Sequence, residues 1–274
     1  TPSNTPQTLA FIGGGNMASA IISGLIKDGT PASSIMVVEP FADARQRLQA
    51  QFGVRVLAEA NASLAEASLV IWAVKPQTFK EAAQQTRQFC ANALHLSVAA
   101  GIRSDSIANW LGTQRVVRAM PNTPALVGLG QTGLFARTAV TPQDKTWVEQ
   151  VVATTGALLW VSDEPLLDAV TAISGSGPAY VFFFIEAMVE AGVKMGLSAE
   201  QATQLAIGTF EGASQLAKTA TEPPSVLRER VTSKGGTTYA ALTSMQNAKV
   251  GELFQIALQA AQHRAHELGD EFGA

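Results

Sequence analysis

The sequence predicts an α/β protein with an N-terminal doubly wound, mainly parallel sheet followed by an all-α part. Three observations carry this prediction. Short apolar runs alternate with helical patterns up to about residue 163, a glycine-rich turn follows the first run, and no convincing strand pattern occurs beyond residue 163.

The strands are predicted from apolar runs that lack polar alternation, a pattern typical of strands buried on both faces. In chain order the runs are Leu9–Ile12, Ile35–Val38, Leu69–Val74, Leu94–Ala99, Val116–Ala119, Leu134–Ala136 and Leu158–Val161. Helical segments separate them, among them the stretch from Met17 and the segment Thr141–Ala153. Because parallel strands need crossover helices, this alternation predicts a sheet covered on both faces.

The part after Asp163 is predicted to be helical throughout. The predicted helices are Pro165–Ser174, Pro178–Met195, Ser198–Lys218, Ser225–Val231 and Thr237–Phe272. Ser198 and Gln201 have the spacing of a capping box, and Gly196 ends the preceding helix. We therefore predict two domains, residues 1–163 and 164–274, which agrees with a length of about 150 residues per domain.

Charge and composition argue against several classes of partner. The 274 residues hold 19 Lys and Arg and 22 Asp and Glu, a net charge of −3, which argues against binding to nucleic acid or to an anionic membrane. Charged residues make up 15% of the chain against a usual figure of about 25%, so the polar surface is thin. Together with the apolar run Phe182–Ile185, this predicts a large homodimer interface.

The sequence predicts neither a membrane-spanning segment nor a metal site. The dense apolar run at 181–189 is far shorter than the ~20 residues that span a bilayer, and Glu186 interrupts it. The polar N-terminus, Thr1–Gln7, has no signal core, which predicts a cytoplasmic location. Cys90 is the single cysteine, and His263 and His266 have no third ligand nearby in the sequence.

A G-x-G-x-x-A motif, Gly13-Gly14-Gly15-Asn16-Met17-Ala18, joins the first strand to a helix. Gly13 suits a tight turn, Gly15 lets a pyrophosphate approach the backbone, and Ala18 lets helix and strand pack closely. The free amides at the helix start then face the anion. In this strand-turn-helix context the motif predicts a dinucleotide-binding, Rossmann-type domain, the alternative being an ordinary glycine turn.

Glu39 ends the second strand and follows Gly13 by 26 residues. This is near the spacing of about 20 residues at which an acidic side chain binds the adenosine ribose hydroxyls. A carboxylate at that place repels a 2′-phosphate. The alternative is a solvated glutamate before Pro40.

Other strand ends also suggest walls of a cofactor site, because open α/β sheets bind ligands at the carboxyl ends of their strands. Ala73-Val74-Lys75-Pro76 and Ala99-Ala100-Gly101 offer small residues that let the backbone reach a nicotinamide. Lys75 suits a phosphate or ribose, or is a solvated helix-start lysine. In Pro121-Asn122-Thr123-Pro124, Asn122 and Thr123 suit either an ordinary turn or donors to the ligand.

Two glycine-bearing segments interrupt the helical part. Ser174-Gly175-Ser176-Gly177-Pro178 precedes an apolar helix, and its glycines equally suit simple helix packing. The segment Val231–Thr238, which contains Ser233-Lys234-Gly235-Gly236-Thr237-Thr238, opens another helix. Amides and hydroxyls at a helix N-terminus suit a carboxylate ligand without a side-chain cation.

In this order, and over nearly the whole chain, these motifs resemble those of pyrroline-5-carboxylate reductase. The resemblance implies an N-terminal Rossmann domain and a helical domain through which subunits interlock as dimers, often assembled into decamers. It implies NADH or NADPH binding at Gly13, Gly14, Gly15, Asn16, Met17, Asn61, Ala73, Val74, Lys75, Pro76, Ala99, Ala100 and Gly101. To these we add Ile12, Glu39 and Asn122 as predicted cofactor residues. It implies substrate binding at Ser233, Gly235, Gly236, Thr237 and Thr238, a loop supplied by the other subunit, and we predict Ser176 as a further substrate residue.

The implied reaction is hydride transfer to the imine of 1-pyrroline-5-carboxylate, which gives L-proline, with Thr238 near the ring nitrogen. Glu39 departs from the small polar residue that many members carry, and we therefore expect NADH preference or dual use. Lys234 departs from a common proline. Two alternatives are a 3-hydroxyacid dehydrogenase-like enzyme, for which the segment 174–180 lacks a lysine, and a non-catalytic dinucleotide-binding protein.

Overall fold

The computed structural model describes residues 7–273. These residues form two compact units: one ends at Ser176 and takes in the chain again from Ala261, and the other is Gly177–Ala260. The units differ from the predicted division at residue 163 because α6 (Leu166–Val170) contacts β7 (Gly130–Ala136) and the last turns of α11 (Val250–Phe272) return to the first unit. Residues 1–6, most of the polar segment behind the cytoplasmic prediction, lie outside the described residues.

The first unit is built on an eight-stranded sheet with the order β3-β2-β1-β4-β5-β6-β7-β8. The remaining strands are β1 (Thr8–Ile12), β2 (Ile35–Val38), β3 (Arg55–Leu57), β4 (Ala67–Trp72), β5 (Leu94–Ser97), β6 (Val116–Met120) and β8 (Gly156–Trp160). Neighbouring strands are parallel, with the exception of the antiparallel pair β6–β7. The predicted mainly parallel, doubly wound sheet is confirmed, and β1 and β4 flank the point where the strand order reverses, the usual place of a ligand crevice.

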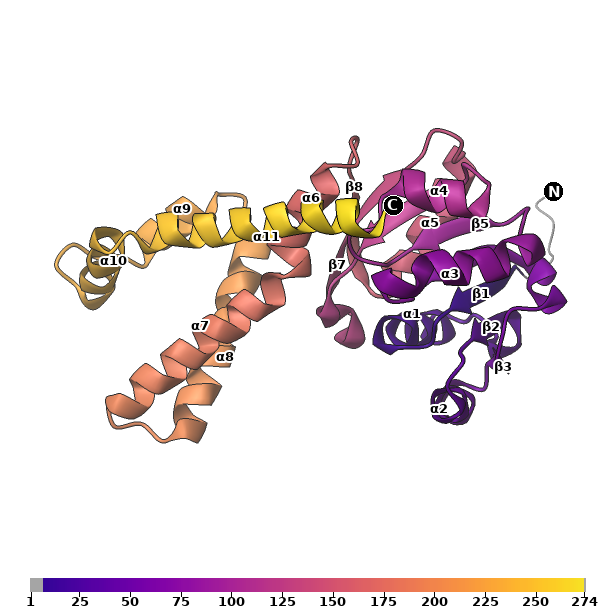
Figure 1. Cartoon of the computed structure of the whole chain (residues 1–274). Coiled ribbons are helices and arrows are strands. Elements are labelled where there is room, and N and C mark those ends of the chain that lie inside the picture. The colour runs from indigo at the N-terminus through magenta and orange to yellow at the C-terminus, as the bar shows by residue number, and fades with distance from the viewer. Residues whose placement is uncertain (1–6, 274) are drawn as a thin grey trace. The chain divides into compact units, whose positions relative to one another are not determined.

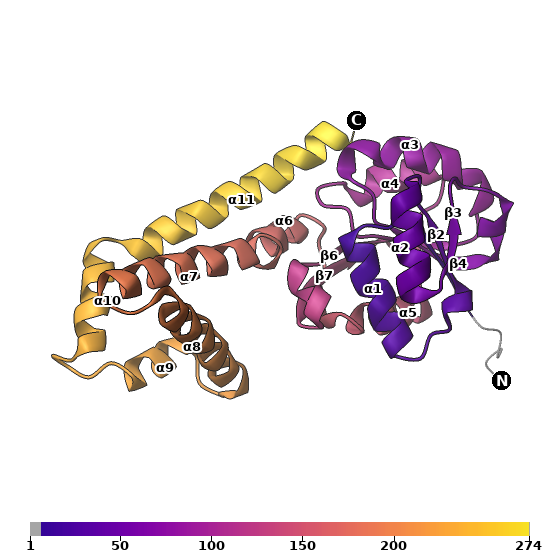
Figure 2. The same cartoon turned by 90° about the horizontal axis from the view of Figure 1, so that it is seen from below.

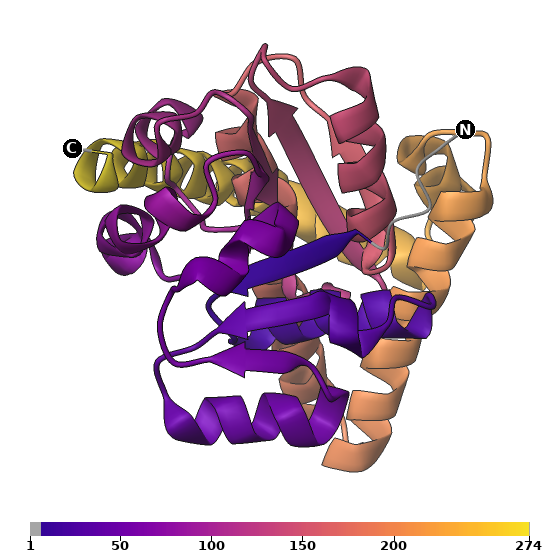
Figure 3. The same ribbon diagram turned by 90° about the vertical axis from the view of Figure 1, so that its right-hand side faces the viewer.

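Helices cover both faces of this sheet (Figure 3). One face carries α1 (Asn16–Lys27), α2 (Ala42–Phe52) and α5 (Pro142–Ala153), and the other carries α3 (Pro76–Thr86) and α4 (Ser104–Leu111). Alternate strand residues pack into the two cores: Phe11 lies with Ile22 in one, and Ile12 lies with Phe79 in the other. A strand that is apolar at every position therefore has a buried partner on each side.

The second unit is helical (Figures 1 and 2). It contains α7 (Gly177–Lys194), α8 (Ala199–Thr219), α9 (Pro224–Arg230), α10 (Thr237–Asn247) and the first turns of α11. The predicted capping box is confirmed, because the Ser198 side chain accepts from the Gln201 amide and the Gln201 side chain accepts from the Ser198 amide, each at 3.0 Å. Phe254 of α11 makes edge contacts with Tyr180 and Phe184 of α7, with ring centroids 5.5 Å apart in both pairs.

Two expectations about secondary structure were wrong. The strand β3 was not predicted, because its three residues include Arg55 and are too few to show a period. The single helix predicted over Thr237–Phe272 is two helices, α10 and α11, separated at Ala248 and Lys249. Lys249 has a φ of 57°, a left-handed conformation that neither glycine nor proline signals at this place.

The apolar helical stretch of the second half is longer than the apolar run at 181–189 indicated. The continuous helical stretch Leu166–Lys194 is long and apolar enough, by length and composition, to cross a membrane, and 6% of its most apolar window is buried. Phe182 and Phe183 are 62% and 65% exposed in the single chain. Large exposed aromatic side chains are typical of the cores of subunit interfaces, which agrees with the interface predicted from the thin polar surface.

Candidate functional site

The glycine turn after β1 is closed on one side and open on the other. Gly13 has a φ of 95°, its amide donates to the Val38 carbonyl at 2.9 Å, and a Cβ added there would overlap the Ala73 carbonyl oxygen. A Cβ on Gly15 would meet nothing within 4 Å. No side chain caps α1, which starts at Asn16, so its first amides are available to a ligand. An anion such as a pyrophosphate fits this open side of the turn.

A cleft of about 750 Å³ lies beside this turn. Of the predicted cofactor residues, those that line it are Ile12, Gly13, Gly14, Gly15, Glu39, Ala73, Val74 and Lys75. The cleft lies at the carboxyl ends of β1, β2 and β4 and is of the size that small-molecule cofactors occupy. Phe41 and Arg47 also line it and were not predicted, although Phe41 follows Glu39 closely as the N-cap of α2, and Arg47 lies within that helix.

Glu39 is tied to the glycine turn. Its Oε2 accepts a hydrogen bond from the Gly14 amide at 2.9 Å, and its Oε1 accepts one from the Phe41 amide at 3.2 Å. The residue is 7% exposed, so the alternative of a solvated strand-end glutamate is wrong. A carboxylate is therefore fixed where β2 enters the cleft.

Several predicted cofactor residues do not line the cleft. Met17 packs against the core, and Pro76 is the first residue of α3, after Lys75 at the N-cap. The Asn61 side chain accepts from the Ser63 amide at 2.9 Å and caps a short 3₁₀ helix. Asn16 is exposed at the start of α1. The roles predicted for these residues toward a cofactor stay predictions.

Asn122 connects two predicted segments of the first unit. Its Nδ2 donates to the Ser174 carbonyl at 3.1 Å, and its Oδ1 accepts from the Gln131 amide at 2.8 Å. The residue is 8% exposed, so both ends of its amide are used inside the protein. Ser174 lies in a π-helical turn, Thr171–Gly175, and the amide of Ser176 donates to the Thr171 carbonyl at 2.8 Å. π-Helical turns are frequent at functional sites.

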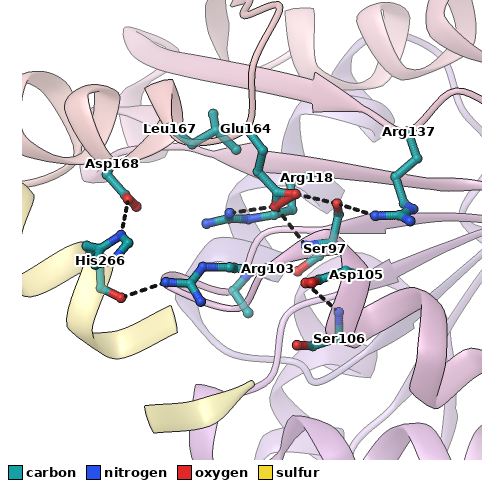
Figure 4. A network of polar contacts seen from close by, with 12 residues as sticks. Ser97, Arg103, Asp105, Ser106, Arg118, Arg137, Glu164, Leu167, Asp168 and His266 are labelled. Atoms are coloured by element: carbon teal, nitrogen blue, oxygen red, sulfur yellow. Dashed lines mark hydrogen bonds and ion pairs between the residues drawn. The ribbon is translucent and has the colours of Figure 1, made fainter. Parts of the chain in front are cut away.

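The loop after β5 brings Ala99, Ala100 and Gly101 to the same edge of the sheet as Ala73. The Val98 amide donates to the Trp72 carbonyl at 3.0 Å, and the Ala99 amide donates to the Ser97 Oγ at 3.2 Å. Gly101 has a φ of 78° and is buried. Polar contacts hold the residues that follow this loop (Figure 4).

The hydroxyl-rich loop belongs to the second unit and opens α10. Gly235 has a φ of 76°, and the amide of Gly236, the N-cap residue, donates to the Ser233 carbonyl at 3.0 Å. No side chain caps α10, so the amides of its first turn are available to an anion. Ser233 and Thr237 are exposed and Thr238 is half-buried in the single chain. The predicted carboxylate site therefore has the donors that it needs.

Residues 7–273 contain no group of three or more His, Cys, Asp or Glu side chains placed to hold a metal ion. His266 lies near Asp168 at 3.7 Å and near Asp270 at 3.8 Å, on the first unit. Cys90 is buried, and desolvation raises the pKa of its thiol to about 11.

Comparisons with known proteins identify both parts of the chain. Residues 164–268 match the family model described as pyrroline-5-carboxylate reductase dimerisation, and residues 8–101 match the one described as NADP oxidoreductase, coenzyme F420-dependent. The pyrroline-5-carboxylate reductase of Pseudomonas aeruginosa is 42% identical over 272 residues, which cover 98% of this chain and 99% of that protein. The corresponding protein of Arabidopsis thaliana is 36% identical, with 95% of each chain covered.

Solved structures agree with these matches. A pyrroline-5-carboxylate reductase from Coxiella burnetii has a TM-score of 0.90 and 37% identity, with 96% of this chain and 99% of that chain covered. A pyrroline carboxylate reductase from Plasmodium falciparum with NADP bound has a TM-score of 0.86 and 28% identity, with coverages of 96% and 98%. The first half is thus a nucleotide-binding oxidoreductase domain, and the second contains a dimerisation domain. The chain belongs to the pyrroline-5-carboxylate reductase family.

Proposed function

We propose that this chain reduces 1-pyrroline-5-carboxylate to L-proline with NADH or NADPH. The observation that carries the proposal is the uncapped start of α10, with Thr237 and Thr238 in its first turn, in the same chain as an open glycine turn at Gly15. One offers donors to a small carboxylate, and the other offers donors to a pyrophosphate. A 3-hydroxyacid also carries a carboxylate, so the argument against a 3-hydroxyacid dehydrogenase is the absence of a lysine from the segment 174–180. A non-catalytic nucleotide-binding protein needs the second feature alone.

The residues that line the cleft fit the dinucleotide. The amides of the turn Gly13–Gly15 and of the start of α1 would hold the pyrophosphate, and Glu39 would face the adenosine ribose. Ala73 to Lys75 line the cleft, and the loop from Ala99, which follows the neighbouring strand and does not line it, would complete the nicotinamide side of the site. When bound, the reduced nicotinamide supplies the hydride that the imine carbon accepts, and the protein supplies orientation.

We infer that NADH is preferred and that NADPH is also accepted. The carboxylate of Glu39 is held at the cleft by the Gly14 and Phe41 amides, so it cannot easily turn away from a 2′-phosphate. Arg47 lines the same cleft and offers a cation to such a phosphate. A fixed negative charge and an exposed positive charge at the same cleft together favour dual use with a bias toward NADH.

The substrate would be held by the loop that opens α10. We propose that its amides bind the carboxylate and that the Thr238 hydroxyl binds the ring nitrogen and relays its proton. A protonated ring nitrogen makes the imine carbon the better hydride acceptor, so the site needs a proton path more than a strong base. Ser233, Gly235, Gly236 and Thr237 shape this loop, and Ser176 would contribute from the turn before α7.

The proposed site needs a dimer, because the resemblance assigns the α10 loop to the other subunit. The exposed phenylalanines of α7 support a permanent dimer, and assembly into a decamer is a further proposal. Sedimentation at micromolar concentration tests this: a dimer or a multiple of it is expected, and a stable monomer would contradict the proposal. A cytoplasmic location stays a prediction.

The function is tested by incubating the purified chain with 1-pyrroline-5-carboxylate and each cofactor and identifying the product. We expect L-proline in equal amount to the cofactor oxidised. Oxidation of small 3-hydroxyacids without proline formation would establish the dehydrogenase alternative. Cofactor binding without turnover of either substrate would establish the non-catalytic one.

A further inference from the structure

The loop Ala99–Arg103, between β5 and α4, is held by the carboxyl-terminal turns of α11, 163 residues or more further along the chain (Figure 4). We propose that Arg103, together with the segment His266–Asp270 of α11, is a clamp that positions this loop against the nicotinamide half of the cofactor. The inference rests on the proposed function, because that function places a nicotinamide beside the loop.

Two glycines allow the loop and the helix to approach closely. A Cβ on Gly101 would lie 2.9 Å from the Cβ of Leu268, and a Cβ on Gly269 would lie 2.8 Å from the Arg103 guanidinium. Each glycine therefore faces a side chain from the other segment. A larger residue at either place would push the helix and the loop apart.

The guanidinium of Arg103 makes directional bonds across this contact. Its Nη1 pairs with Asp270 Oδ1 at 2.7 Å, and its Nη2 donates to the His266 carbonyl at 3.0 Å. The Ser106 Oγ adds a bond to the Gly273 carbonyl at 3.1 Å. An exposed ion pair alone stabilises little, but the planar guanidinium here also lies over the Gly269 backbone, which fixes its orientation.

The other end of the loop is anchored to the sheet. The Ser104 amide donates to Glu164 Oε2 at 2.8 Å, and the Ser104 Oγ donates to Glu164 Oε1. Arg118 Nη1, on a side chain that is 5% exposed, donates to the same Oε2 at 3.1 Å. With Ala99 bonded to β5 and Ser104 bonded to Glu164, both ends of the loop are fixed. The clamp then determines the position of the span between them.

This arrangement assigns Arg103 a positioning role. Hydride transfer depends steeply on the distance and the angle between donor and acceptor, so a small displacement of the wall of the site lowers the rate. The proposed adenosine half lies at Glu39 and Phe41, between β2 and α2, and the cleft there is not lined by this loop. Loss of the clamp should therefore lower kcat and disturb the placement of the nicotinamide half of the cofactor. The affinity for the adenosine half should stay unchanged.

Gly269→Ala is the most selective test. The added methyl group meets the flexible end of Arg103 rather than backbone, and alanine favours a helix, so the fold is expected to persist. Arg103→Ala removes the guanidinium, and Arg103→Lys retains a charge for Asp270 without the planar fork. Arg264→Ala is the matched control, because Arg264 lies on the same helix and pairs with Glu267 and Glu271, whereas Arg103 bonds to Asp270 and the His266 carbonyl.

Three readouts separate positioning from general damage. In the cofactor-free protein, we expect the amides of Ala100–Ser104 to exchange hydrogen about tenfold faster in Gly269→Ala and Arg103→Ala than in the control. We expect kcat to fall about tenfold in both, and less in Arg103→Lys, with the dissociation constant of ADP-ribose unchanged. Exchange and kcat equal to the control would overturn the proposal, as would a parallel loss of ADP-ribose affinity. If the wild-type chain does not reduce pyrroline-5-carboxylate, the proposed function fails while the exchange result still decides whether the clamp holds the loop.

Discussion

Glu39 Oε2 accepts a 2.9 Å hydrogen bond from the backbone amide of Gly14. This bond joins the end of β2 to the glycine turn after β1, so the residue expected to distinguish the cofactors is fixed to the residues expected to bind their pyrophosphate. The carboxylate cannot swing away without leaving the Gly14 amide unpaired, which has a free-energy cost.

Neutralising Glu39 should shift the cofactor preference. Glu39→Gln keeps an acceptor for Gly14 and removes the charge, so we expect the ratio of kcat/KM for NADH to that for NADPH to fall by about tenfold, or about 1.4 kcal/mol. Steady-state kinetics with both cofactors measures this ratio. Asp43→Asn, in the first turn of α2, is the control and should leave it unchanged. A wild-type preference for NADPH, or an unchanged ratio in Glu39→Gln, would contradict the role of Glu39.

Alanine substitutions at Gly13 and Gly15 should have different effects, the first on the stability of the fold and the second on cofactor binding. An alanine at Gly13 would meet the Ala73 carbonyl oxygen and hold a φ of 95°, so we expect a loss of at least about 2 kcal/mol in the free energy of unfolding. Gly15→Ala adds a methyl group in open space, and we expect a stability within about 1 kcal/mol of wild type.

Cofactor titration completes this comparison. Because the pyrophosphate needs the bare backbone at Gly15, we expect Gly15→Ala to bind NADH at least about tenfold more weakly although it is folded. Urea denaturation gives the stabilities, and fluorescence titration gives the affinities. Normal NADH affinity in Gly15→Ala would mean that the pyrophosphate lies elsewhere.

Removing the Thr238 hydroxyl should lower turnover. We expect Thr238→Ala to reduce kcat at least about tenfold, which is roughly 1.4 kcal/mol in the barrier, and Thr238→Ser to retain most of the rate. The NADH dissociation constant should not change, because the cleft proposed to bind the cofactor is lined by residues of the first unit. Thr219→Ala, at the end of α8, is the control. An unchanged kcat in Thr238→Ala would remove this residue from the mechanism.

The buried His95 should make stability depend on pH. Desolvation lowers the pKa of His95 to about 4, and its Nδ1 accepts from Trp72 Nε1 at 3.0 Å. Because the unfolded chain, with a pKa near 6.5, binds the proton more readily, stability should fall as the pH falls from about 6.5 toward 4, by up to ~3 kcal/mol. Urea denaturation at pH 7 and pH 5 measures the change. His95→Asn, which keeps an acceptor but does not titrate, should show a smaller change, and an equal one would contradict this assignment.

The sequence predicted what local patterns encode. Apolar runs located the strands other than β3, and the glycine turn located the cleft, because both are properties of consecutive residues. The break at Lys249 has no such signal, so α10 and α11 were merged. The contacts of Gly101 with Leu268 and of Asn122 with Ser174 join residues far apart in the chain, and no periodicity predicts them. Asn61 was predicted from the resemblance alone, because no local pattern around it points to a cofactor.

The most direct test of the proposed reaction measures where the hydride of the cofactor goes. The chain is incubated with 1-pyrroline-5-carboxylate and NADH that carries deuterium at both positions of nicotinamide C4, and the product is examined by mass spectrometry and NMR. Hydride transfer from the nicotinamide predicts L-proline with one deuterium on the δ carbon, the former imine carbon. Proline without deuterium at that carbon, or no proline at all, would contradict it.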